Sequence, residues 1–72
     1  MKPVVQVIAD QLRIPRDRIR DELEYGAIPE WDSLKHVDLM LALEAEYGVT
    51  IDEDRMVKLT TVRAIRTFVE AR

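Results

Sequence analysis

The stretch PEWDSLKHVDLMLALEAEYG, residues 29–48, predicts one helix with two apolar stripes. Asp32 and Ser33 are both favoured residues at a helix start, and Gly48 is favoured just beyond a helix end. At about 100° per residue, the side chains of residues 33–47 separate into two sets. The first stripe contains Leu39, Met40, Leu43 and Tyr47, and the second contains Leu34, Val37, Leu41 and Ala45.

One apolar stripe is enough to dock a surface helix on a core, so the second stripe needs its own explanation. Either the helix is central and buried on two sides, or the second stripe binds a partner in the manner of a helix in a groove. Asp38 and Glu44 border the second stripe and would form a polar rim around such an interface.

The first helix is predicted from Pro3 to about Leu12, with Pro3 at the first helical position, where its missing N–H costs nothing. Pro15 is expected to end this helix and to hold Ile14 extended. The apolar stripe of this first helix is formed by Val4, Ile8 and Leu12, joined by Val5. Residues 15–32 then form a long connection in which Ile19 and Leu23 are the expected anchors to the core.

Two further helices follow Gly48. Asp52 is the predicted cap of a short helix over residues 53–59, and Thr60 or Thr61 is the predicted cap of the last helix. The apolar stripe of the last helix contains Val62, Ile65, Phe68 and Val69. The fold class is therefore all-α: a single domain, residues 1–72, folded as a four-helix bundle of three main helices and one short helix, with a long loop between the first two.

Composition excludes several kinds of site. The 72 residues contain no cysteine and one histidine, which removes disulfides and thiolate zinc sites and argues against a metal site of any kind. The net charge is −3, and this acidic balance argues against a nucleic-acid partner, although Arg13, Arg16, Arg18 and Arg20 form a local basic cluster. Interleaved acids make a solvated loop face the simpler interpretation of that cluster. We expect no membrane span and no targeting segment.

Ser33 and His36 invite comparison with a nucleophilic enzyme because they are three residues apart on one helix. A serine hydrolase also needs a group that orients the base and an oxyanion site in a concave pocket. Asp32 and Asp38 are poorly placed to orient His36, and a bundle this small has little room for such a pocket. We therefore expect no catalytic residues, and a partly buried, hydrogen-bonded His36.

DSLKHVDLMLALEAEYGVTI, followed by LTTVRAIRTFV, resembles the acyl carrier proteins over essentially the whole chain. The resemblance implies that Ser33 carries 4′-phosphopantetheine, attached covalently from coenzyme A by a phosphopantetheinyl transferase, with Asp32 as the acid beside it. Acyl-loading and acyl-processing enzymes would be the other partners of a cytoplasmic monomer. By position, Leu34, Lys35, Val37, Asp38 and Leu41 correspond to the partner-binding surface, and Leu39 and Leu43 to the lining of the acyl cavity.

Two residues depart from the housekeeping fatty-acid members of that family. Lys35 stands two residues after Ser33, where those members commonly have an acid, and Trp31 stands where they have a small residue. Both departures favour a specialised pathway, such as polyketide, polysaccharide, lipid or amino-acid synthesis. An aminoacyl or peptidyl carrier remains an alternative, although EWDSL lacks the glycine pattern of peptidyl carriers. Two further alternatives are an unmodified helical interaction module and a helix-turn-helix DNA binder.

Overall fold

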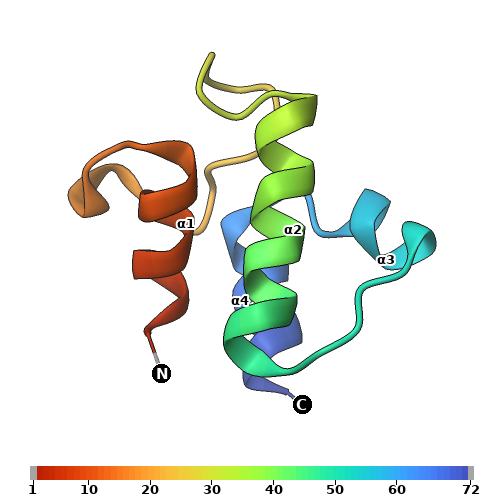
Figure 1. Ribbon diagram of the computed structural model, residues 1–72. Coiled ribbons are helices and arrows are strands. Elements are labelled where there is room, and N and C mark those ends of the chain that lie inside the picture. Colours follow the sequence, from red (N-terminus) through yellow and green to blue (C-terminus); the bar gives the residue numbers. More distant parts are fainter. Residues whose placement is uncertain (1, 72) are drawn as a thin grey trace.

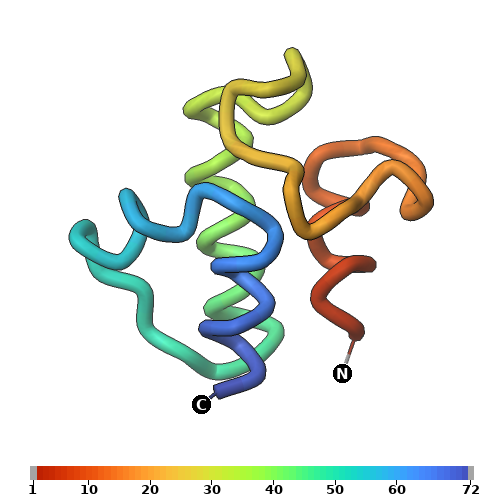
Figure 2. Tube along the Cα trace, turned by 180° about the vertical axis from the view of Figure 1, so that it is seen from behind, coloured from red at the N-terminus to blue at the C-terminus, as the bar shows by residue number. Residues whose placement is uncertain are grey.

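Four α-helices pack around a shared core in the computed structural model, which describes residues 2–71 (Figure 1). The helices are α1 (Val4–Leu12), α2 (Ser33–Tyr47), α3 (Glu53–Lys58) and α4 (Val62–Glu70), with a short 3-10 helix η1 (Arg16–Arg18) after α1. Helix α2 is central, with α1 on one side and α3 on the other, and α4 lies behind it in Figure 1 and in front of it in Figure 2. The predicted four-helix bundle, with its long connection between the first two helices, is confirmed.

Local capping residues set the starts of three helices. In each case the cap side chain accepts a hydrogen bond from the backbone N–H three residues later, which satisfies one of the unpaired groups of the first turn. Asp32, Asp52 and Thr61 accept from Lys35, Arg55 and Ala64 at 2.9, 2.8 and 3.0 Å. Asp32 and Thr61 are therefore the caps, rather than Ser33 and Thr60. Gly48 closes α2 in the left-handed conformation (φ 65°), as predicted.

Helix α1 begins one residue later than predicted and ends at Leu12, as predicted. Pro3 is the extended residue before the helix (ψ 150°) and not the first helical residue. The helix ends at Leu12 because Arg13 adopts a left-handed conformation (φ 59°), two residues ahead of Pro15. Its stripe also differs: Val7 is buried and Val5 only half-buried, since α1 packs against both α2 and α4.

The core contains three or four apolar residues from each of α1, α2 and α4, and four from the connections. Trp31, which lies in the long connection, is fully buried, and so are Leu39, Leu43 and Ile65. In α4 the predicted stripe is buried at three positions, while Phe68 is half-buried at the edge of the core. The buried apolar residues of the core are Val4, Val7, Ile8, Leu12, Ile14, Trp31, Leu39, Met40, Leu43, Tyr47, Ile51, Leu59, Val62, Ile65 and Val69.

The long connection is fixed to the start of α4. Ile19 and Leu23 are partly buried against the core, as predicted. The backbone N–H of Tyr25 donates to the carbonyl of Thr60 at 2.8 Å, and that of Val62 donates to the carbonyl of Leu23 at 3.0 Å. These bonds hold the residues that precede α2 against the start of α4, almost forty positions later in the chain.

An ion pair ties the same connection to the middle of α4. Asp21 accepts a hydrogen bond from the guanidinium of Arg66 at 2.7 Å, and this bond raises the pKa of Arg66 above its usual value. Both side chains are partly exposed, so solvent weakens the ion pair. The backbone hydrogen bonds therefore contribute more than this pair to holding the connection against α4.

The two stripes of α2 have opposite environments. Leu39, Met40, Leu43 and Tyr47 are all buried, whereas Leu34, Val37 and Leu41 expose 76%, 43% and 57% of their surface. The second stripe is therefore not part of the core, and the interpretation of α2 as a helix buried on two sides is wrong. None of the helices within residues 2–71 is long and apolar enough to cross a membrane.

Replacing Leu43 by Ala should lower the free energy of unfolding by about 2–5 kcal/mol, because it removes a fully buried side chain and leaves a cavity. The matched change Leu41→Ala, two residues away on the same helix, should change it by no more than about 0.5 kcal/mol. Urea unfolding followed by far-UV circular dichroism measures both. Equal losses would show that the two stripes belong to one core.

Candidate functional site

Ser33 is the first residue of α2 and its side chain is exposed. Because Asp32 caps the helix, the Ser33 hydroxyl is left without a hydrogen-bond partner in residues 2–71. The backbone N–H groups of Ser33 and Leu34 also find no acceptor in the part of the chain described. The serine oxygen therefore lies at the positive end of a 15-residue helix, where a phosphate joined to it would meet free N–H groups.

The turn before Ser33 is anchored by Trp31, whose indole is fully buried. Its backbone carbonyl accepts from the N–H of Gly26 at 3.1 Å, and its N–H donates to the carbonyl of Ile28 at 3.2 Å. Gly26 has a φ of 83°, a conformation that residues with a Cβ rarely adopt. The position of Asp32 and Ser33 thus follows from a buried aromatic side chain next to them in the chain.

His36 links this turn to α3. The indole Nε1–H of Trp31 donates to His36 Nδ1 at 3.0 Å, so Nδ1 is an acceptor and the ring proton is on Nε2. His36 Nε2–H in turn donates to the carbonyl of Met56 at 3.0 Å. The rings of Tyr25 and His36 pack in a T-shaped arrangement, with centroids 5.2 Å apart.

This arrangement gives His36 a structural role. It is 94% buried, since only 6% of its surface is exposed, and both ring nitrogens are engaged by Trp31 and Met56. Neither nitrogen is available to take a proton from Ser33. The predicted buried, hydrogen-bonded histidine is confirmed, and the resemblance of Ser33 and His36 to a hydrolytic pair has no support in the geometry.

A pocket of about 280 Å³ opens beside Ser33, between the start of α2, α3 and the end of the long connection. It is lined by Tyr25, Ser33, His36, Val37, Met56, Val57 and Thr60. Of these residues, sequence reasoning had singled out Ser33, His36 and Val37. Met56 and Val57 are far from Ser33 in sequence, and the bond from His36 to the Met56 carbonyl holds α3 beside the serine. Tyr25 packs against His36 from the long connection.

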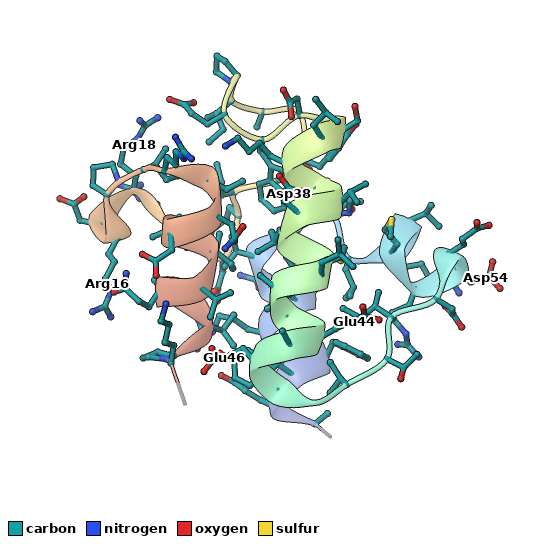
Figure 3. The ribbon with its side chains drawn as sticks, viewed as in Figure 1. Arg16, Arg18, Asp38, Glu44, Glu46 and Asp54 are labelled. Carbon is teal, nitrogen blue, oxygen red and sulfur yellow. The ribbon has the colours of Figure 1, made fainter. Side chains whose placement is uncertain are left out.

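The other residues of the predicted site divide between surface and core. Leu34, Val37, Asp38 and Leu41 are exposed along α2, and Lys35 is half-buried beside them. Asp38 faces outward in Figure 3. Glu44, by contrast, accepts a hydrogen bond from the N–H of Ile51 at 2.7 Å, so it fastens the connection to α3 as well as bordering the exposed stripe.

Leu39 and Leu43 were predicted to line an acyl cavity. Both are fully buried in the core, and neither lines the pocket beside Ser33. Their role toward an acyl chain therefore stays a prediction. Tyr25 is not predicted from the sequence, and Trp31 is noted there only as a departure from the housekeeping members. The usable signal for the role of Trp31 is that the single Trp and the single His are five residues apart and both need polar partners when buried.

The two bonds of His36 can be separated by substitution. Asn at position 36 keeps an acceptor near the Nδ1 position for Trp31, whereas Gln keeps a donor near the Nε2 position for Met56. His36→Gln leaves the fully buried indole N–H unpaired and should cost about 1–3 kcal/mol of unfolding free energy, more than His36→Asn. Urea titrations, with the indole N–H resonance of Trp31 as the local reporter, measure the difference. A more stable Gln variant would contradict the assigned bonds.

Comparison with known proteins identifies the family. The family model described as "Phosphopantetheine attachment site" matches residues 2–69. The acyl carrier protein of Thermosynechococcus vestitus is 33% identical over 69 residues, which cover 96% of this chain and 85% of that protein. Those of Petrotoga mobilis (36% identity, covering 82% and 69%) and Rickettsia canadensis (30%, covering 96% and 80%) are similar as well. The chain therefore belongs to the acyl carrier protein family.

Proposed function

We propose that Ser33 is the residue to which 4′-phosphopantetheine is attached, and that the protein carries acyl groups in this way between the enzymes of one pathway. The observation that supports this most directly is the exposed Ser33 hydroxyl, which has no intramolecular partner in residues 2–71 and lies at the N-terminus of α2. When bound, the arm supplies the terminal thiol that holds the acyl group as a thioester. The chain has no cysteine that could supply one.

The residues around Ser33 suit such an arm. The free N–H groups at the start of α2 favour its phosphate, and the apolar pocket of about 280 Å³ beside the serine offers contact for its chain. Asp32 keeps the first turn of α2 in place, and the Trp31–His36 hydrogen bond keeps Asp32 in place. A reducing compartment such as the cytoplasm suits a carrier that depends on a free thiol.

We propose further that the exposed stripe of α2 is the surface that a phosphopantetheinyl transferase and the acyl-loading and acyl-processing enzymes contact. Leu34, Val37 and Leu41 supply apolar area next to Ser33, and Asp38 supplies a charge at its edge. Contact on this surface would place Ser33 against the partner. Lys35 lies on the same surface and would repel the basic patch of an enzyme adapted to an acidic carrier helix. This repulsion supports a specialised pathway over bulk fatty-acid synthesis.

Incubation of the apo protein with coenzyme A and a broad-specificity transferase should add one phosphopantetheine to the wild type and none to Ser33→Ala. Intact-mass spectrometry reads the result. Ser33→Ala should remain folded, because Asp32 and not Ser33 caps α2. An unmodified wild type would favour the alternative of an unmodified interaction module, and modification of Ser33→Ala would place the attachment elsewhere.

Lys35→Glu should speed loading of the modified protein by a housekeeping malonyl transferase. The gain should correspond to on the order of 1 kcal/mol or less, and it should shrink as salt is raised, because the charge is partly solvated. The comparison is the loading rate of wild type and Lys35→Glu at low and high ionic strength. Arg16→Glu, which makes the same change of charge at η1, is the control and should leave the rate unchanged. Equal rates for all three proteins would remove Lys35 as a reason for a specialised pathway.

A further inference from the structure

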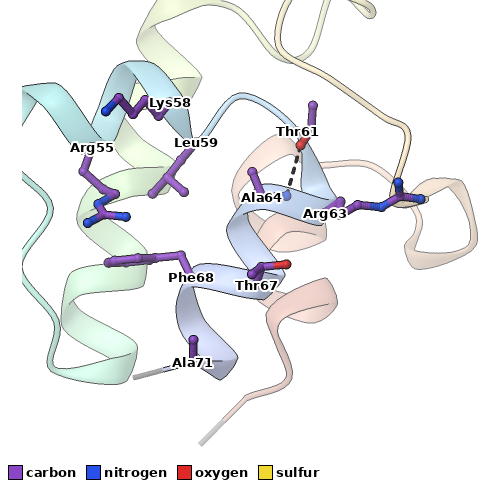
Figure 4. Close-up of a pocket in the computed structure, with 9 residues that line it drawn as sticks. All are labelled: Arg55, Lys58, Leu59, Thr61, Arg63, Ala64, Thr67, Phe68 and Ala71. Carbon is purple, nitrogen blue, oxygen red and sulfur yellow. Dashed lines mark hydrogen bonds between the residues drawn. The ribbon is translucent and has the colours of Figure 1, made fainter.

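A second and larger hollow lies between α3 and α4, outside the pocket at Ser33. Its volume is about 650 Å³, against about 280 Å³ for the pocket beside the serine. The two share none of their lining residues. We call it the α3–α4 groove, and it is lined by Arg55, Lys58, Leu59, Thr61, Arg63, Ala64, Thr67, Phe68 and Ala71 (Figure 4).

The charge of the α3–α4 groove is opposite to that of the protein. Three of its lining residues are cations and none is an acid, whereas the whole chain has a net charge of −3. Arg63 is neutralised by ion pairs with Asp21 and Glu22, at 3.8 and 3.4 Å. Arg55 and Lys58 have no carboxylate within 4.0 Å among residues 2–71, so the α3 side of the groove has two uncompensated positive charges.

The floor of the groove is largely apolar, and one of the cations packs against it. The guanidinium of Arg55 lies over the ring of Phe68, 5.0 Å from its centroid, in a cation–π contact. Figure 4 shows the Arg55 side chain above the Phe68 ring, with Leu59 between α3 and the start of α4. Stacking covers one face of the guanidinium and leaves its N–H edges for an acceptor.

We propose that the α3–α4 groove binds an acidic segment of a partner protein, in which an apolar side chain is flanked by carboxylates. The apolar side chain would cover Phe68 and Ala64, and the carboxylates would pair with Arg55 and Lys58. A protein segment fits better than a small metabolite, because the groove is an open surface hollow and its two free cations lie along one wall. Charge complementarity selects an acidic segment over a basic or neutral one.

Binding in the groove would leave Ser33 accessible. None of the groove residues belongs to α2 or lines the pocket beside the serine. A partner held on α3 and α4 could therefore keep the carrier close to its enzymes while α2 engages each enzyme in turn. This inference does not depend on the modification of Ser33, so the Ser33→Ala variant should bind the same segment equally well.

The test is a titration of the ¹⁵N-labelled protein with a synthetic hexapeptide that has a central Phe flanked by Asp and Glu. The expected result is saturable shifts of amide resonances in α3 and α4, with α2 unaffected. Lys58→Glu should weaken binding at least fivefold, because Lys58 makes no ion pair within residues 2–71 that the change could disturb. A peptide with Ala in place of Phe should bind less well.

Arg16→Glu is the matched control, since it makes the same change of charge on an exposed residue of η1 that lines neither hollow. It should leave the affinity within twofold of wild type. An equal loss in both variants would reduce the effect to overall charge and overturn the proposal. So would shifts confined to α2, no saturable binding, or binding of phosphatidylglycerol vesicles without binding of the peptide.

Discussion

The hydrogen-bonded chain from Trp31 through His36 to Met56 is the interaction on which the candidate site depends. It joins the turn before Ser33, the first two turns of α2 and the middle of α3 through two bonds of 3.0 Å each. A buried indole N–H without an acceptor is unfavourable, so the imidazole must stay in one tautomer and one orientation. The pocket beside Ser33 has its shape because this chain holds α3 against α2.

The central helix α2 has two apolar sides with different roles, one in the core and one on the surface. Its buried side supplies Leu39, Met40 and Leu43 to the core, and its opposite side exposes Leu34 and Leu41. Exposed apolar side chains give no stability to the isolated chain, so their presence beside a serine with a free hydroxyl needs a reason in binding. The proposed contact of partner enzymes with this surface would provide that reason.

Charge is distributed unevenly over the small surface. The α2 side carries Asp38 and a single lysine near the serine, whereas the α3–α4 groove has only cations among its charged residues. Surfaces that differ in charge select different partners and steer them to different places. A carrier that must meet several enzymes benefits from such a separation, because one contact does not obstruct the other.

The sequence by itself determined the four helices and the cap Asp52, and it limited the caps of α2 and α4 to two neighbouring residues each. Capping by Asp32, Asp52 and Thr61 is a contact over three residues, and the left-handed Gly48 is a property of one residue, so both are visible in the sequence. Only the tertiary structure decided that Trp31 is core, that His36 bridges two elements, and where the two hollows lie. These features depend on contacts between residues far apart in the chain, such as Tyr25 with Thr60 and His36 with Met56, and periodicity along one helix carries no information about them.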